Sequence, residues 1–176
     1  SRGAAPTMTL FLLVVSCLLS VHLWIYPGWL DSGELAVGAH VLGVAHAPGE
    51  PTYTLLGNFF SLLPLGSIVF RTNLLSLVFA VGSAALAIFI TRRLLAWTCS
   101  INGHSASVLS GAVALFIVLH VSIGLQITRT EVYSIQLFFS LLAVALGVKM
   151  LESEDERIGR VLAFGLGLAF GIHPLI

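Results

Sequence analysis

Two carboxylates three residues apart, Asp31 and Glu34, stand where the chain first turns polar after a long apolar run. A carboxylate fixed at such an edge can take a proton from an acceptor hydroxyl, which is general-base chemistry. Asp31 is the better placed of the two because it follows the apolar run more closely. The pair also fits a capping box, with Asp31 at the N-cap of the next helix and Glu34 at position N3. The two interpretations are compatible, since a capping carboxylate is also held rigidly.

Two arginines stand near the ends of later apolar runs, and a guanidinium fork suits phosphate oxygens. Arg71 and Arg129 are therefore candidates to contact a phosphate, with snorkelling to a membrane interface as the alternative. For Arg129, a local ion pair with Glu131 is a further alternative. His173 precedes Pro174, so termination of a helix competes with any role in binding.

A divalent metal ion is a second possibility for the acidic segment. Asp31, Glu34 and His46 offer ligand atoms, but their spacing matches no compact metal motif. The segment His46 to Pro51 is most simply a rigid turn. We therefore expect no cofactor, and we keep a divalent metal on these three residues as the alternative.

Composition indicates a membrane protein. The chain is 57% hydrophobic and only 9% charged, whereas a soluble domain carries about a quarter charged residues. Too few polar groups remain to cover a water-exposed surface. The formal net charge is zero, which argues against a nucleic-acid partner.

Apolar runs predict five membrane spans, at about 8–26, 73–95, 107–127, 132–150 and 161–176. Residues 27–72 form an external loop with two short helix-like stretches, 34–45 and 53–66, which we expect to lie at the membrane interface. The chain starts without Met and stops within an apolar run. We therefore expect residues 1–176 to be the amino-terminal part of one larger transmembrane domain.

Five runs occur in order along the chain: Asp31-Ser-Gly-Glu-Leu35, Leu42-Gly-Val-Ala-His46-Ala-Pro-Gly49, Tyr53-Thr-Leu-Leu56, Phe70-Arg-Thr-Asn-Leu-Leu-Ser76 and Thr130-Glu-Val-Tyr-Ser134. Together they resemble one family of multi-pass membrane proteins, which includes the eukaryotic protein O-mannosyltransferases. The resemblance covers roughly residues 8–176.

The family looks like part of the GT-C glycosyltransferase superfamily, which implies an all-α, polytopic helix bundle with interfacial helices in its first external loop. It also implies inverting transfer of a sugar, with mannose expected, from a polyprenyl- or dolichyl-phosphate donor to an acceptor hydroxyl on a protein or glycan. Asp31 and Glu34 take the place of the acidic catalytic motif. The candidate substrate-binding residues are His46, Tyr53, Arg71, Asn73, Arg129, Glu131, Tyr133 and His173.

Two other functions stay open: a transporter or flippase of a lipid-linked substrate, and a non-catalytic membrane subunit. A transporter should place polar groups near the membrane midplane, whereas the ionisable residues here gather at the ends of the expected spans. A non-catalytic subunit should tolerate the loss of Asp31.

The positive residues predict the topology, because cytoplasmic loops are rich in Lys and Arg. Six cations (Arg2, Arg92, Arg93, Lys149, Arg157 and Arg160) fall on one side of the expected spans, and Arg71 and Arg129 fall on the other. We expect the amino terminus and loop 92–106 to be cytoplasmic. Loop 27–72 would face the lumen of the endoplasmic reticulum or the bacterial periplasm.

An impermeant thiol reagent should label single cysteines in 27–72, and labelling near residue 100 in intact cells would contradict the assignment.

Overall fold

The computed structural model describes residues 11, 15, 30–47 and 49–172. These residues fold into helices and connecting turns, with no strand among them, which confirms the all-α class. The described helices are α2 (Ser32–Val41), α3 (Pro51–Ser61), α4 (Ile68–Cys99), α5 (Gly103–Leu119), α6 (Val121–Ile127), α7 (Tyr133–Glu152) and α8 (Glu156–Phe170). Of the first expected span, 8–26, only Phe11 and Val15 fall among the described residues, and both are helical.

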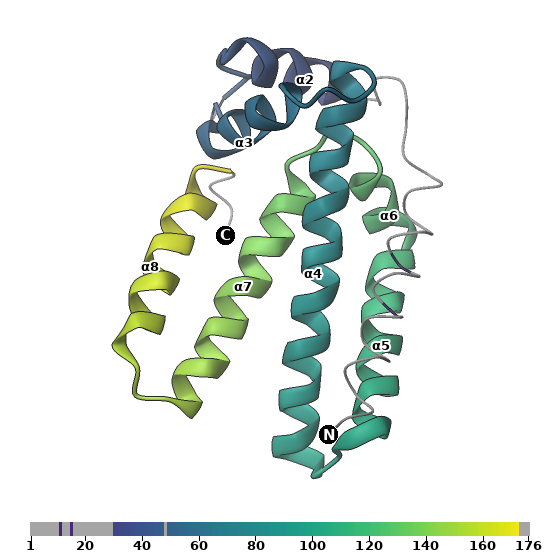
Figure 1. Cartoon of the computed structure of the whole chain (residues 1–176), viewed down its shortest axis with the longest axis vertical. Coiled ribbons are helices and arrows are strands. Elements are labelled where there is room, and N and C mark those ends of the chain that lie inside the picture. Colours follow the sequence, from purple (N-terminus) through teal and green to yellow (C-terminus); the bar gives the residue numbers. More distant parts are fainter. Residues whose placement is uncertain (1–10, 12–14, 16–29, 48, 173–176) are drawn as a thin grey trace.

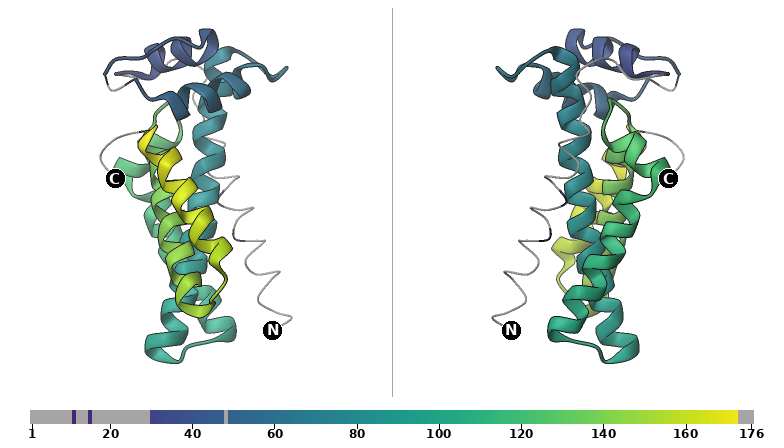
Figure 2. Two further views of the ribbon diagram at one scale, coloured as in Figure 1. Left: turned by 90° about the vertical axis from the view of Figure 1, so that its left-hand side faces the viewer. Right: turned by 90° about the vertical axis from the view of Figure 1, so that its right-hand side faces the viewer.

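Helix α4 is the long central element of the bundle (Figure 1). It packs against α5 on one side and α7 on the other, and α8 follows beyond α7. The short helices α2 and α3 lie across one end of this bundle, as Figure 2 shows from two sides. Within the described part of the chain, α4 and α7 are the helices long and apolar enough to cross a membrane. Helix α5 is apolar but shorter.

The helix expected over 107–127 is divided at His120. This residue has an extended backbone (φ −62°, ψ 127°) and serves both as C-cap of α5 and as N-cap of α6. Its amide donates to the carbonyl of Phe116, and its own carbonyl accepts from the amides of Ile123 and Gly124. The backbone groups at the break are thus paired across it, which makes the interruption inexpensive. The sequence pattern missed it because the apolar run continues through the turn.

Two apolar clusters hold the bundle together. One packs the small side chains Ala80, Ala84 and Ala87 of α4 against α5, and small residues let helix backbones approach closely. The other joins the crossing helices to the bundle, since Leu35 of α2 and Tyr53 of α3 belong to the same cluster. The remaining buried members of this second cluster are Ala39, Ala45, Leu75, Val132, Ile135, Phe139, Ala169 and Ile172.

Helices α2 and α3 pack closely because a glycine stands at their contact. A Cβ built on Gly57 would lie 2.7 Å from the Cβ of Ala39, closer than two non-bonded carbon atoms approach. Next to it, the Asn58 amide donates to the carbonyls of Ala39 (3.0 Å) and His40 (3.1 Å). These contacts satisfy the free carbonyls at the end of α2. The pair of short helices therefore forms one unit.

A buried polar network fastens the loop between α6 and α7 to helix α4. The Thr130 hydroxyl donates to Asn73 Oδ1 (2.5 Å) and lies 2.7 Å from the hydroxyl of Thr72. The Ser76 hydroxyl contacts the backbone N–H (3.5 Å) and the carbonyl (3.4 Å) of Glu131. All of these residues are buried, so the network fixes the loop as firmly as apolar packing would.

This network predicts the effect of Thr130→Val, which keeps the shape of the side chain and removes the hydroxyl. We expect a loss of about 1–3 kcal/mol in unfolding free energy, because buried polar partners lose a hydrogen bond. Thermal unfolding of the purified protein in detergent measures it. Thr98→Val is the matched control, since the exposed Thr98 hydroxyl bonds only within its own helix turn and to Cys99. Equal melting of the two variants would contradict the prediction.

Candidate functional site

The residues expected to carry the chemistry gather at the end of the bundle that α2 and α3 cover. Asp31 precedes α2, Glu34 lies in its first turn, and His46 lies in the loop that follows. Glu131 and Tyr133 reach the same end from the α6–α7 connection. Segments separated by about a hundred residues thus meet at one place. His173 lies outside the described residues.

The capping box considered as one interpretation of Asp31 and Glu34 does not form. The Asp31 side chain makes no capping hydrogen bond, although its backbone stands at the N-cap of α2. The Glu34 carboxylate turns instead to His46, accepting from its backbone N–H (2.6 Å) and contacting its Nδ1 (3.3 Å). The other ring nitrogen, Nε2, lies 3.8 Å from Asp31 Oδ2. The Asp31 carboxylate is therefore free of a capping role.

His46 stands between two carboxylates and is exposed. The hydrogen bond to Glu34 raises the pKa of the His46 imidazole, and the charge of Asp31 raises it further. One ligand atom from each of Asp31, Glu34 and His46 lies within 4.8 Å of the others, so the three could also hold a divalent ion. The positively charged, doubly protonated form of His46 cannot bind a metal ion, because only the neutral imidazole has a free nitrogen lone pair.

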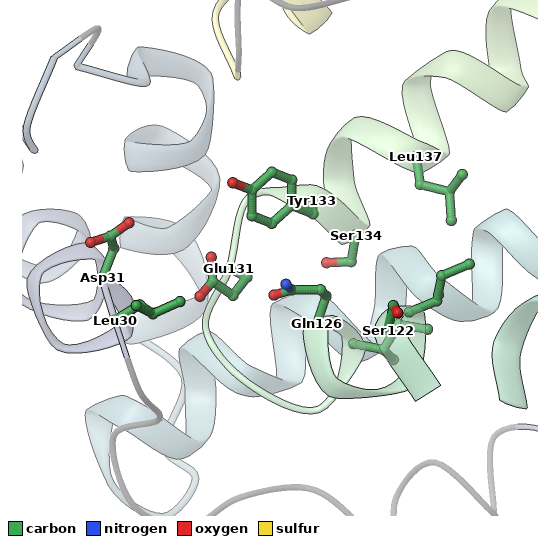
Figure 3. Close-up of a pocket in the computed structure, with 10 residues that line it drawn as sticks. Leu30, Asp31, Ser122, Gln126, Glu131, Tyr133, Ser134 and Leu137 are labelled. Carbon is green, nitrogen blue, oxygen red and sulfur yellow. The ribbon is translucent and has the colours of Figure 1, made fainter. Parts of the chain in front are cut away.

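A cavity of about 420 Å³ lies between α6 and α7, with Asp31 at its edge (Figure 3). One end is polar and carries the side chains of Asp31, Glu131, Gln126 and Ser134. Apolar side chains line the rest, among them Ile123, Ile127 and Leu137. Helix α6, which begins after the break at His120, supplies one wall of this space. The volume falls in the range of small-molecule sites, about 300–1,000 Å³.

Arg129 and Glu131 form a buried ion pair, with Arg129 Nη2 3.3 Å from Glu131 Oε1. The same nitrogen donates to Gln126 Oε1 (2.9 Å). Burial raises the pKa of the Glu131 carboxyl, and the Arg129 charge opposes this rise. The local ion pair considered from the sequence is therefore present, and its Glu131 partner lines the cavity.

Glu50 was not among the site residues expected from the sequence, yet it has features of one. It is a non-glycine residue in the left-handed region (φ 43°) at the N-cap of α3, a strained conformation often found at functional sites. Its side chain is 3% exposed, and Oε2 has no partner among the described residues. Burial raises the pKa of the Glu50 carboxyl, while His46 opposes the rise. Position 50 carried no sequence signal beyond its acidic side chain.

Three other expected binding residues are used by the fold. The Arg71 guanidinium donates from all three nitrogens to backbone carbonyls: Nε to Leu65 (2.6 Å), Nη1 to Ser61 (2.6 Å) and Nη2 to Gly66 (3.0 Å). Asn73 belongs to the buried network, and Tyr53 is 1% exposed in the core. Burial raises the pKa of the Tyr53 hydroxyl, and the negative charges of Glu50 and Glu131 raise it further. None of these three residues lines the cavity.

Comparison with known proteins gives two kinds of match. The family profile described as the protein O-mannosyl-transferase TMEM260 N-terminal domain matches residues 31–176. Protein O-mannosyl-transferase TMEM260 of Mus musculus is 35% identical over 144 residues, which cover 79% of this chain and 19% of that protein. The Dictyostelium discoideum protein of the same name is 31% identical over 182 residues, covering 94% and 21%. The chain thus spans about a fifth of these relatives' length. No solved structure matches.

The contacts of Arg71 predict a structural effect for Arg71→Lys. An ammonium group cannot reach three carbonyls in the directions that a guanidinium fork does. We expect a loss of about 1–3 kcal/mol in unfolding free energy and an unchanged affinity for the sugar donor. Thermal unfolding and donor titration of the full-length protein measure the two effects. Arg160→Lys, at an exposed ion pair with Glu156, is the matched control. A normal melting temperature together with weakened donor binding would show that Arg71 binds the donor.

Proposed function

This chain belongs to the TMEM260 protein O-mannosyl-transferase family, and from that premise we propose that it forms the amino-terminal part of a multi-pass membrane glycosyltransferase with a GT-C-like bundle. The enzyme would transfer mannose from a polyprenyl- or dolichyl-phosphate donor to a hydroxyl group of a protein. Its catalytic end would face the lumenal or periplasmic side. Helices α2 and α3 would lie at that membrane interface.

The observation that carries the proposal is the Asp31 carboxylate. It lines the cavity at the end of the bundle, it caps no helix, and His46 lies beside it. A general base must lie within hydrogen-bond reach of the proton that it removes and must keep an acceptor site free for it. Asp31 meets both conditions better than Glu34, whose carboxylate is bonded to His46.

The proposed reaction is a single displacement at the anomeric carbon of the donor. The acceptor oxygen forms a bond to C1 while the bond from C1 to the phosphate oxygen breaks, and the lipid phosphate leaves with the electron pair. Asp31 takes the proton of the acceptor hydroxyl. Attack from the face opposite the leaving group inverts the anomeric configuration. His46 would orient Asp31, and Glu34 would orient His46.

A leaving phosphate requires positive charge nearby. Among the described residues, Arg129 is the better candidate, because Arg71 donates all three of its guanidinium nitrogens to the backbone. Arg129 contacts Gln126 and Glu131, which both line the cavity. We therefore propose that Arg129 faces the donor phosphate from the rim of the polar end.

Catalysis without a metal ion is our proposal for the acidic cluster. The hydrogen bond that His46 donates to Glu34 favours the protonated form of His46, and this proton would balance part of the carboxylate charge. A divalent ion on Asp31, Glu34 and His46 is the alternative, in which Asp31 would bind the ion rather than a proton.

We predict that Asp31→Asn in the full-length protein lowers kcat by about 10²- to 10⁴-fold, the usual contribution of a general base. Folding should be unaffected, because the side chain makes no capping bond. Transfer of radiolabelled mannose from polyprenyl-phosphate mannose to a protein acceptor measures the rate. A variant as active as the wild type would remove Asp31 from the mechanism.

Asp155→Asn is the matched control, since Asp155 accepts from the N–H of Arg157 as a true N-cap at the start of α8. Asparagine caps helices as well as aspartate does, so this variant should transfer mannose normally. Dialysis of the wild type against EDTA tests the metal alternative in the same assay. Activity lost to EDTA and restored by a divalent ion would assign Asp31, Glu34 and His46 to a metal site.

A further inference from the structure

We propose that the polar end of the cavity between α6 and α7 binds the ring of a neutral hexose through Glu131, Gln126 and Ser134. The inference rests on the proposed function and goes further, because it assigns a ligand class to this cavity and separates the place of the sugar from that of the phosphate. Figure 3 shows Gln126 and Ser134 close to each other, with Glu131 between them and Asp31.

Ser134 gives the first argument. Its side chain is 2% exposed and lines the cavity at the start of α7, and its Oγ has no hydrogen-bond partner among the described residues. A buried hydroxyl without a partner costs free energy that an alanine would not. A ligand hydroxyl in the cavity would supply the missing partner.

Glu131 and Gln126 give the second argument. Glu131 is 3% exposed, and its Oε1 contacts Arg129 as an ion pair but accepts no hydrogen bond. The Gln126 carbonyl oxygen accepts from Arg129, so its amide group is left to donate elsewhere. The cavity thus presents a carboxylate acceptor, an amide donor and a hydroxyl that can do either.

This set of groups matches a polyhydroxylated ring. Each sugar hydroxyl can donate to a carboxylate and accept from an amide, and the C–H faces of the ring suit the apolar walls formed by Ile123, Ile127 and Leu137. A phosphate fits poorly, because Asp31 and Glu131 both bring carboxylates to this end. We therefore place the sugar, and not the phosphate, inside the cavity.

The hexose could belong to the lipid-linked donor or to a mannosylated acceptor, since the ring chemistry is the same. Two probes separate these sources: polyprenyl-phosphate mannose for the donor, and an O-mannosylated peptide for the acceptor. Polyprenyl phosphate without a sugar tests whether the lipid phosphate alone is bound.

The first experiment compares full-length Ser134→Ala with the wild type. We expect kcat/KM for polyprenyl-phosphate mannose, or the affinity for the mannosylated peptide, to fall about tenfold, the effect of one lost hydrogen bond to a ligand. Melting should stay the same or rise, because the variant removes an unpaired buried hydroxyl. Ser83→Ala is the matched control: Ser83 is also buried, bonds to Phe79 within α4 and does not line the cavity. A normal kcat/KM together with a normal affinity for the mannosylated peptide in Ser134→Ala would overturn the proposal.

The second experiment needs no catalysis. Ser122 is exposed and lines the same cavity, so Ser122→Cys, with Cys17 and Cys99 replaced by serine, should react with a small thiol reagent. Protection by polyprenyl-phosphate mannose supports the donor as the source, and protection by the mannosylated peptide supports the acceptor. Equal protection by bare polyprenyl phosphate, or no protection by either sugar probe, would overturn the proposal.

The two experiments also separate this inference from the proposed function. A wild-type enzyme that transfers no mannose, but whose introduced thiol is protected by a sugar probe, would refute the transferase and keep the sugar site. A wild-type enzyme that transfers mannose, while Ser134→Ala behaves like Ser83→Ala and no probe protects, would keep the transferase and refute the sugar site.

Discussion

The candidate site depends on one buried polar contact, the hydrogen bond between Thr130 and Asn73. It fixes the α6–α7 loop to the central helix, and that loop carries Glu131 to the end of the bundle. Helices α2 and α3 reach the same end by a separate route, through the apolar cluster around Leu35 and Tyr53. Both routes meet on α4, so this helix sets the position of Asp31 relative to Glu131. The two carboxylates need no direct contact to be held in one place.

Unpaired polar atoms are concentrated at this end of the described chain. Oxygen or nitrogen atoms of Glu50, Tyr53, Arg129, Glu131 and Ser134 are buried there without a hydrogen-bond partner. Each such atom destabilises the fold, whereas the polar groups of the Thr130 network, a short distance away, are satisfied. Of these residues, Glu131 and Ser134 line the cavity, so a ligand bound there could reach their unpaired oxygens.

The sequence predicted the helical class and the two short helices before α4, and it placed Asp31, Glu34 and His46 in the segment where the structure brings them together. These follow from apolar run lengths, Pro and Gly breaks and local charge, which act over a few residues. It did not predict the bonding of Glu34 to His46, the carbonyl contacts of Arg71 or the burial of Glu50. Those depend on which segments meet: Arg71 binds the turn after α3, and Glu34 bonds to His46, which lies 12 residues further along the chain. The sequence did not predict the break at His120, because the apolar run continues through it.

The distribution of charge at this end bears on how a phosphate-linked sugar could be oriented. Asp31 and Glu131 bring carboxylates to the lining of the cavity, while Arg129 contacts Glu131 and carries the opposite charge. A mannosyl phosphate lying across this boundary would have its ring among the carboxylates and its phosphate toward the guanidinium. Its C1–oxygen bond would then lie between the two regions, with Asp31 on the sugar side. Because the ion pair holds the guanidinium and the carboxylate together, the same contact would fix both halves of the donor.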